Sequence, residues 1–368
     1  MQENKKIDLF LAALNPYKES NIIENVEKKI TGKDFVIWGE NNGYPNYLLD
    51  CYNNCSTLQS IINGTGDYVT GDDVICNIAD FSKTINKKGE TIKDLVAKIA
   101  IDYITFGAFS LQIIRNMAGQ VAEIYWVDVA KLRCDEKNEV FYYSEDWSKS
   151  YGRVKTLQYP KFGVNDSNPT SIFYFKNPLS RGTYGVPVYA AAMKNINIDM
   201  AITDFHNNEI NNGFMSSKMI NFCNGQPEES LKEEIERNLT EKFSGSGNAG
   251  RFVISFSQSR ENAPEIATLG TDDFDKRYVE LEKRTTQQIF VAFRAQPIIF
   301  GLQKENNGFS QDEYLQAFAL YNRTMVLPIQ NNIVGAFDKI FGMKNSVTIK
   351  PFSIEVVDNT LTDKEVVQ

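Results

Sequence analysis

Three acidic residues, Asp272, Asp273 and Asp275, lie close enough in sequence to share one Mg²⁺ ion. Carboxylates are among the oxygen ligands that this ion accepts in proteins. The same residues also begin a helical pattern, and acidic side chains stabilise the positively polarised N-terminus of a helix. We interpret the cluster as the start of a helix. A metal-dependent hydrolase or nuclease that uses it stays open as the alternative.

Other side chains that commonly bind metals or act as nucleophiles are sparse. The chain has five cysteines and a single histidine, His206, which falls inside a long predicted helix. Cys51 and Cys55 are the one close pair of cysteines, and no second pair at zinc-like spacing accompanies them. We therefore predict buried free thiols, and a histidine that is a polar residue of the helix surface or the core.

Several sequence motifs of catalytic sites are missing from the chain. It contains no G-x-x-x-x-G-K-[ST] phosphate loop, no G-x-S-x-G elbow, no H-E-x-x-H and no C-x-x-C pair. We predict that the protein is not an enzyme and needs no cofactor.

A polar loop carries side chains that could contact phosphate groups. Gln303, Lys304, Asn306 and Asn307 are hydrogen-bond donors suited to phosphate oxygens, and such contacts do not read base sequence. By itself the loop could be a plain solvated connection. It joins two long predicted helices, and a loop of that length is usually functional or disordered.

Two predicted helices must position this loop. In the first, apolar residues recur at three- and four-residue steps, which is one face of a helix. These residues are Phe274, Tyr278, Leu281, Thr285, Ile289 and Phe293. The second helix opens with the capping box Ser310-x-x-Glu313. Pro328 lies inside it and should kink or break it.

The chain before residue 183 shows an α+β pattern without repeated βαβ units. After a turn at Asn42-Gly43 we predict a helix along Tyr47–Ile62 that Gly64, Gly66 and Gly71 bring to an end. Residues 91–106 form a second amphipathic helix with Gly107 as its natural stop.

A β-hairpin follows, with its turn at Met117–Gly119, and aromatic β-prone segments come after it. A long helix then begins near Pro187, which suits a first helical turn, and ends at Asn212-Gly213. Its apolar residues lie on more than one side, so we expect it to be largely covered.

Residues 214–270 have a different composition. Two predicted strands flank the charged helix 228–243, which has few apolar residues for a core of its own. A unit this small buries little surface alone, so we expect it to complete its core against a neighbouring copy. After Phe341 the tail becomes strand-like and ends in polar residues.

Composition limits the class of protein. The chain has 368 residues, 42% of them hydrophobic and 23% charged, which is ordinary for a folded protein of two or three domains. No run approaches the roughly 18 apolar residues of a membrane helix, and the N-terminus lacks a signal peptide. We expect synthesis and assembly in the cytoplasm. The net charge of −8 argues against a protein that grips nucleic acid along its whole surface.

Several segments, in this order, resemble the portal protein family of tailed phages. The matching segments are Asn42-Gly43-Tyr44-Pro45, Tyr68-Val69-Thr70-Gly71, Asp102-Tyr103 to Gly107-Ala108-Phe109, Glu123–Asp128, Ile172–Phe175 with Tyr184-Gly185-Val186-Pro187, Asn212-Gly213-Phe214, and Phe293–Gly301. Each motif is weak singly, and their order along most of the chain carries the resemblance.

The resemblance implies a portal fold assembled as a closed ring of about twelve subunits at one capsid vertex. It divides the chain into an N-terminal wing, a stem of two helices, a small α/β clip, a tunnel loop, a kinked wing helix and a short C-terminal wing or crown segment. In that order of parts, the residues are 1–183 (wing), 184–213 and 271–295 (stem), 214–270 (clip), 296–312 (tunnel loop), 313–341 (kinked helix) and 342–368 (C-terminal segment).

The same resemblance implies the partners. The ring would pass double-stranded DNA without sequence preference, through contacts at Gln303, Lys304, Asn306 and Asn307. The clip would dock the terminase large subunit and later the head–tail adaptor, through acidic residues of its helix. The residues are Glu233, Glu234 and Glu236. The major capsid protein and scaffold are further implied partners, and a membrane is not.

A second alternative is a structural module of another kind, a head–tail adaptor or scaffold-binding module that forms no ring. The mass of the purified protein separates it from a large ring, and metal-dependent cleavage lost in Asp273→Ala would support the nuclease.

Overall fold

The computed structural model describes residues 22–29, 34–147, 156–164, 168–211, 218–222, 228, 230–231, 234, 252–256, 274–302 and 311–354. The chain divides into two compact units. The larger consists of Ile22–Ile196 with Thr286–Gln368, and the smaller of Met1–Asn21 with Asn197–Thr285. The larger unit is therefore discontinuous in sequence.

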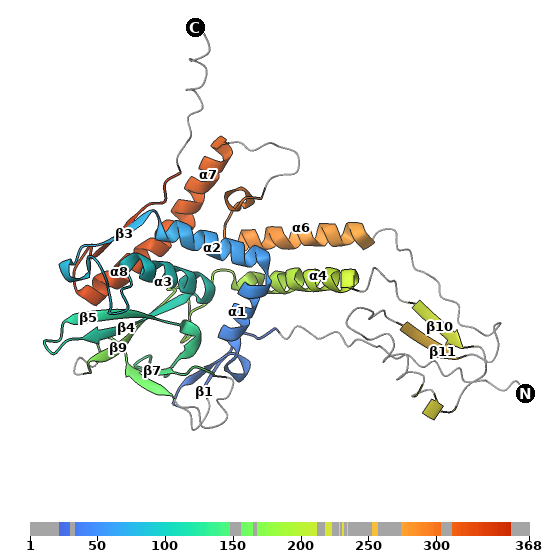
Figure 1. The fold of residues 1–368 in the computed structure, drawn as a ribbon, viewed down its shortest axis with the longest axis horizontal. Helices are drawn as coiled ribbons and strands as arrows, with labels where there is room; N and C mark the ends of the chain where they lie inside the picture. The colour runs from blue at the N-terminus through green and yellow to red at the C-terminus, as the bar shows by residue number, and fades with distance from the viewer. Residues whose placement is uncertain are drawn as a thin grey trace, which may run out of the picture. The chain divides into compact units, whose positions relative to one another are not determined.

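The larger unit is built around an antiparallel sheet with the strand order β5-β4-β9 (Figure 1). The central strand β4 (Ala108–Arg115) pairs with β5 (Val121–Val127) and with β9 (Thr170–Lys176). Alternate β4 side chains, Phe109, Leu111 and Ile113, are fully buried. Strands β4 and β5 form the predicted hairpin, whose turn contains Gly119 at φ 79°.

Helix α3 (Ile92–Phe106) packs along this sheet, and its ends lie where the sequence predicts them. Thr91 and Asp94 exchange hydrogen bonds in a capping box at its start. Gly107 ends it at φ 70°, a left-handed conformation that glycine adopts at little cost. Helices α2 (Ser56–Thr70) and α8 (Leu327–Phe341) pack against α3, on the same side of the sheet (Figure 1).

The C-terminal segment belongs to the larger unit. Strand β12 (Val347–Lys350) pairs antiparallel with β3 (Asp73–Cys76), which confirms the strand-like pattern of the tail. The 3₁₀ turn η2 (Ala79–Phe81) follows β3, and Phe81 contacts the Phe341 ring of α8.

A second sheet, β6-β7-β8, is formed by Leu132–Cys134, Val140–Tyr143 and Leu157–Pro160. The short turn η3 (Val129–Lys131) leads into it, and the hairpin β1–β2 (Glu27–Lys29 and Val36–Trp38) lies next to it in contact with β6. The turn η1 (Glu40–Asn42) then leads into helix α1 (Tyr44–Asn54).

Arg133 of β6 is buried between two indole rings. Its guanidinium lies 5.7 Å from the Trp38 ring and 5.0 Å from the Trp147 ring. It donates to the Asn42 side chain and to backbone carbonyls, including that of Ala130 at 2.9 Å. Burial lowers the pKa of Arg133 to about 10. Because its contacts reach β2, η1 and β6, this cation is a structural group that joins the three elements.

The smaller unit contains the strands β10 (Lys218–Phe222) and β11 (Phe252–Phe256), which pair in parallel. Both strands were predicted, and a parallel pair requires the long crossover that residues 223–251 supply. Helices α4 (Met193–Asn211) and α6 (Phe274–Ala292) each run across the boundary between the units. Within the smaller unit the rings of Phe205 and Tyr278 stack at 4.9 Å and join the two helices.

Three predictions about helices need correction. The helix after Asn42 is two helices, α1 and α2, which meet at Cys55, and Gly64 and Gly66 lie inside α2 instead of ending it. Helix α4 begins at Met193 after the 3₁₀ turn η4 (Ala190–Ala192), not at Pro187. It is also less covered than expected.

Physical reasons for these differences are local. Cys55 is extended (φ −105°, ψ 104°) and its sulfur accepts the Leu58 amide as an N-cap, so a new helix starts there. Two side chains of α4, Ile198 and Phe205, are each 37% exposed. The predicted break near Pro328 is a π-helical turn, η7 (Asn322–Val326), directly before α8.

Candidate functional site

The predicted contact residues Gln303, Lys304, Asn306 and Asn307 lie outside the described residues, as do Glu233, Glu236 and the capping residue Ser310. Glu234 is helical and exposed. The structure describes the chain on both sides of residues 303–310, which we call the channel loop after the role proposed for it below. The site can therefore be built from the two segments that hold its ends.

The segment that enters the channel loop is the end of α6 and the turn behind it. Ile289, Phe290 and Phe293 are buried, which confirms the inward face that the spacing predicts for the end of this helix. Arg294 ends the helix with a left-handed backbone at φ 55°. The chain then forms the 3₁₀ turn η6 (Pro297–Phe300), and Gly301 closes it at φ 83°.

The segment that leaves the channel loop is α7 (Gln311–Tyr321). Asp312 and Glu313 lie in its first turn, where the helix dipole favours acids. Ala317 and Tyr321 form its buried face. The π-helical turn η7 then leads into α8 with Pro328 in the first turn, so Pro328 follows the irregularity and costs no additional backbone hydrogen bond.

Helix α2 binds both segments. The Tyr68 hydroxyl donates to the Ile299 carbonyl oxygen at 2.7 Å, on the entering side. The hydroxyls of Thr65 and Tyr321 lie 2.6 Å apart, on the leaving side. Deeper in the core, Gln330 of α8 donates to the Val69 carbonyl at 2.9 Å. Helix α2 is thus bonded to the turn η6 just before residues 303–310, and to the far end of α7, ten residues after Gln311.

The segments on either side of residues 303–310 expose some apolar side chains. Val291, Leu302 and Leu320 are 65%, 47% and 56% exposed.

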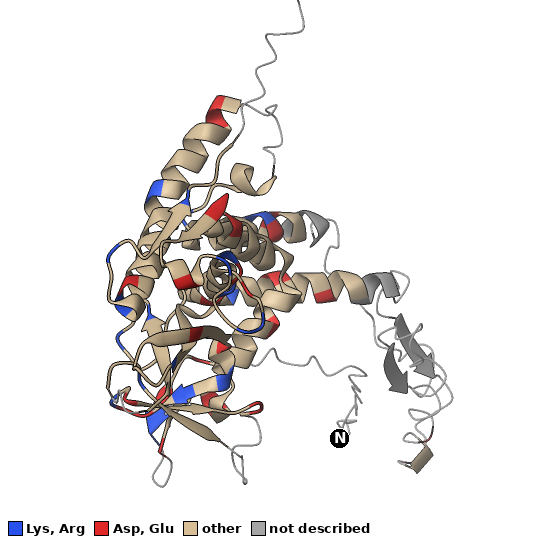
Figure 2. Cartoon of the chain, turned by 60° about the vertical axis from the view of Figure 1, so that its left-hand side comes forward, with Lys and Arg blue, Asp and Glu red and all other residues tan. Residues whose placement is uncertain are grey.

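Charge over the larger unit is mixed in sign. Lys and Arg positions lie among Asp and Glu positions on its sheets and helices (Figure 2). Several form ion pairs, among them Lys87–Glu123 at 2.7 Å and Lys131–Glu145 at 2.5 Å. The residues of this unit that the structure describes therefore form no broad basic face for nucleic acid.

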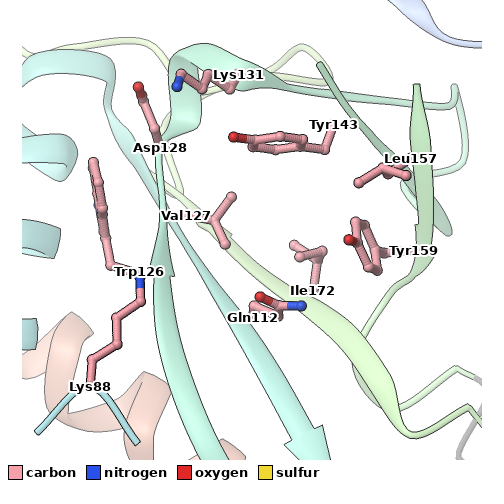
Figure 3. A pocket seen from close by; sticks show the side chains of 10 residues that line it. All are labelled: Lys88, Gln112, Trp126, Val127, Asp128, Lys131, Tyr143, Leu157, Tyr159 and Ile172. Carbon is pink, nitrogen blue, oxygen red and sulfur yellow. The ribbon is translucent and has the colours of Figure 1, made fainter. Parts of the chain in front are cut away.

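A separate cleft of about 330 Å³ lies between the two sheets (Figure 3). Its floor is Gln112, Val127 and Ile172, and Asp128 is the one carboxylate among the residues that line it. Burial raises the pKa of Asp128, and the Ala130 amide that donates to it opposes the rise. The cleft therefore lacks a pair of carboxylates for acid–base hydrolysis.

The metal alternative gains no support from the described residues. No group of three potential ligands occurs among them. Asp272 and Asp273 lie outside them, and the side chain of Asp275 is not described.

Comparison with known proteins decides the family. A family model described as phage portal protein matches residues 82–358, well over half of the chain. The chain belongs to the phage portal protein family. The match includes the channel loop, α6, α7 and α8.

A curated relative and solved structures agree. The probable portal protein of Haemophilus phage HP1 is 21% identical over 254 residues, 68% of this chain and 70% of that protein. A chain from the virion of a native gene transfer agent particle has a TM-score of 0.54 at 16% identity, covering 83% of both chains.

An HK97 family phage portal protein from Corynebacterium diphtheriae has a TM-score of 0.52 at 11% identity, covering 82% of this chain and 93% of that one. A chain from the neck of the native particle, computed with C12 symmetry, has a TM-score of 0.53 at 15% identity and covers 85% and 86%. The predicted mixed α and β portal fold is thereby confirmed.

Membership of the family indicates where the protein acts. This portal protein functions at the capsid vertex and is a component of the virus particle, in a family whose role is structural. Among the helices that the structure describes, none is long and apolar enough to cross a membrane.

The predictions for four of the five cysteines and for His206 agree with the described structure, and Cys223 lies outside the described residues. Cys51, Cys55, Cys76 and Cys134 are buried free thiols. Burial raises the pKa of Cys51 and of Cys134 to about 12, so both stay protonated and unreactive. His206 lies on the exposed surface of α4 beside the Phe205 and Tyr278 rings.

The residues of α2 that bond the segments beside the channel loop were not identified from sequence as part of this site. In the sequence, Tyr68 belongs to a segment that resembles the portal family, and the helical pattern predicts an end near Gly64. A usable signal was present, because two glycines inside an otherwise helical segment often mark a close approach of another element.

Proposed function

We propose that this portal protein assembles head-to-tail into a closed ring of about twelve subunits, and that DNA passes through the ring during packaging and ejection. Residues 303–309 would line the channel. The family membership and the C12 symmetry of a similar neck structure support the ring.

One observation carries the assignment of the loop. The chain between Leu302 and Gln311 is polar up to Phe309. It joins two segments that are both bonded to α2, the turn η6 and the helix α7, the latter through its last residue Tyr321. A loop of polar residues between two packed segments is suited to presenting side chains at a fixed place. Its own residues supply no apolar group for a core until Phe309.

The proposed contact is weak and independent of sequence. Lys304 would meet phosphate oxygens, and Asn306 and Asn307 would offer neutral donors. Glu305 beside Lys304 would repel the phosphates and keep the contact weak. Each neutralised phosphate adds binding free energy, so a channel that lets DNA slide needs few such contacts. The net charge of −8 fits that requirement.

The test is charge reversal in the loop. Lys304→Glu should leave assembly of the ring unchanged and reduce the DNA packaged or retained per particle. Particles matched for capsid content should be compared by DNA content, with native mass spectrometry of the purified protein as the check on assembly. Equal DNA content in variant and wild type removes the loop from the channel, and a monomer at every concentration and in the particle refutes the ring.

The clip would serve as the docking surface for the terminase large subunit and then for the head–tail adaptor. Acidic residues of its charged helix would make these contacts, and the major capsid protein and scaffold would surround the ring at the vertex during assembly in the host cytoplasm. The triple variant Glu233→Lys, Glu234→Lys, Glu236→Lys should form rings but fail to package DNA. Normal packaging by this variant would exclude the helix as the docking surface.

A further inference from the structure

The cleft between the two sheets is the open mouth of one curled sheet. Beyond the end of β8, Lys161 forms a parallel bridge with Ile172 of β9, so the strands follow one another in the order β5-β4-β9-β8-β7-β6. The outer strands of a flat six-stranded sheet lie about 24 Å apart. The connection from Val127 of β5 to Leu132 of β6 reaches at most about 18 Å. The sheet therefore curls, and the mouths of β-barrels are common places for ligand sites.

Buried polar groups hold one wall of this cleft in place. The Trp126 indole N–H donates to the buried Asp102 carboxyl group at 2.8 Å. Lys88 lies on a loop that the buried Asn86 side chain organises. This side chain donates to the Ile124 carbonyl of β5 at 2.9 Å and accepts the Lys88 amide at 3.0 Å. The indole ring and the loop that carries Lys88 are thus positioned before any ligand arrives, which lowers the entropy cost of binding.

Three polar side chains of the lining have no hydrogen-bond or ion-pair partner among the residues that the structure describes. The Tyr159 hydroxyl points into the cleft, and the Gln112 amide lies on its floor (Figure 3). The Lys88 ammonium lies 5.6 Å from the Tyr125 ring centroid, and no described carboxylate is within ion-pair distance of it. A few polar groups that converge on one concave space are typical of a ligand site.

The charges of the lining favour an anionic group. Lys88 and Lys131 stand against one carboxylate, that of Asp128. Lys131 already pairs with Glu145 at 2.5 Å, so Lys88 is the cation that remains for an incoming carboxylate. A nucleic acid strand fits less well, because grooves that bind a strand are positively charged along its length, whereas Asp128 and Glu145 interrupt the positive charge here.

The cleft is open on one side, which favours a peptide segment. Leu157 at its edge is 47% exposed, and Trp126 and Tyr159 are half-buried. Sites for free small molecules bury about 70–90% of the ligand surface. An extended peptide that crosses the cleft would keep one side in water and point alternate side chains inward. Val127 and Ile172 supply an apolar floor for one such side chain.

We propose that the cleft binds a short segment of another protein, in which an apolar side chain packs on Val127 and Ile172 and a nearby Asp or Glu carboxylate pairs with Lys88. Gln112 and Tyr159 would bond to the backbone of this segment. The proposal concerns the larger unit alone and is independent of the channel proposed above.

An array of hexapeptides tests this on the full-length protein as it assembles. Each peptide carries one apolar residue with an Asp or Glu close to it, and a matched array carries Asn or Gln in place of the acid. Wild type should bind a subset of the acidic peptides and bind their amide counterparts more weakly. The best acidic peptide should also change the fluorescence of Trp126, since Trp38 and Trp147 are only 0% and 3% exposed. Trp126→Phe should abolish that change.

Lys88→Gln and Lys87→Gln form a matched pair of variants. Both remove one positive charge from the same loop, but Lys87 pairs with Glu123 at 2.7 Å and is not part of the lining. Lys88→Gln should weaken binding of the best acidic peptide about two- to five-fold, the range for an exposed ion pair, and Lys87→Gln should leave it unchanged. Gln112→Trp, which fills the floor of the cleft, should remove binding altogether.

Several results would overturn the proposal. If no acidic peptide binds more tightly than its amide counterpart, the cleft does not take an anionic segment, and binding that survives Gln112→Trp lies elsewhere. A single-stranded DNA oligonucleotide that binds where no peptide does would assign the cleft to nucleic acid. A smaller assembly of Gln112→Trp in native mass spectrometry would assign it to a second copy of this chain. If Gln112→Trp does not fold, equal binding by Lys88→Gln and wild type decides against the proposal.

Discussion

Gly64 allows the packing of α2 against the turn η6 to be measured as a free energy. In Gly64→Ala the new Cβ would lie 2.9 Å and 3.0 Å from two carbons of the Phe300 ring, closer than carbon atoms tolerate. The ring must shift, and overpacking of this kind costs about 1–3 kcal/mol. The exchange also replaces glycine by alanine inside a helix, which stabilises by about 1 kcal/mol. The expected net effect on the free energy of opening of α2 therefore lies between no change and a loss of about 2 kcal/mol.

Gly335→Ala supplies the comparison. Gly335 lies inside α8, and no heavy atom lies within 4 Å of a Cβ built there. This variant should gain the helix term of about 1 kcal/mol without the steric cost. The two variants should therefore differ by about 1–3 kcal/mol, and that difference isolates the contact with Phe300.

Hydrogen exchange of α2 amides in the full-length protein is the suitable assay, because two compact units make a single unfolding midpoint ambiguous. The free energy of opening should fall or stay level in Gly64→Ala and rise in Gly335→Ala. Replacing the ring by a smaller side chain in Phe300→Leu should lower the free energy of opening less in the Gly64→Ala background than in wild type, because the smaller side chain relieves the clash. Equal stabilisation by both glycine substitutions would refute the close packing of α2 on Phe300.

Two further predictions concern α3. Asp102 is buried and accepts the Trp126 indole N–H at 2.8 Å; burial raises its carboxyl pKa well above the ordinary value. The contribution of Asp102 to stability is therefore greatest below the unfolded pKa and declines as pH rises toward the folded pKa. Asp102→Asn should flatten the dependence of the unfolding free energy on pH above about pH 4. An unchanged slope would contradict this. Thr91→Ala should lower the free energy of opening of the first turn by about 1 kcal/mol, measured by hydrogen exchange. Hydrogen bonds from Thr91 lower the pKa of Asp94, so the carboxylate's share of this cap is present at neutral pH and is lost as pH falls through the folded pKa.

Local patterns predicted the parts of the fold in which neighbouring residues decide the conformation. The limits of α3 follow from the Thr91 cap and from Gly107, and both are short-range interactions. The hairpin of β4 and β5 follows from alternation and a glycine turn, and the buried end of α6 follows from its spacing. The order of these motifs was enough to indicate the portal family, which the comparison confirmed.

Local patterns failed where a distant segment determines the outcome. Gly64 and Gly66 are poor helix residues by propensity, so ending a helix at them was reasonable. In the folded chain their missing side chains admit Phe300 and Ile101, and the packing outweighs the propensity. Likewise Pro328 predicted a break, but local pattern did not give its form, a π-helical turn before α8. Both that turn and α8 contact α2, a helix more than 250 residues earlier in the chain.

The amino-acid sequence by itself indicated the portal family, the limits of α3, the β4–β5 hairpin, and a polar segment with one lysine between two helices. Only the tertiary structure decided which residues bond the elements on either side of that segment. Tyr68 and Ile299 are 231 positions apart, and Thr65 and Tyr321 are 256 apart. No periodicity or motif reports a contact across such separations, because it is the packing of α2, η6 and α7 on one core that brings these hydroxyls and carbonyls within hydrogen-bond distance.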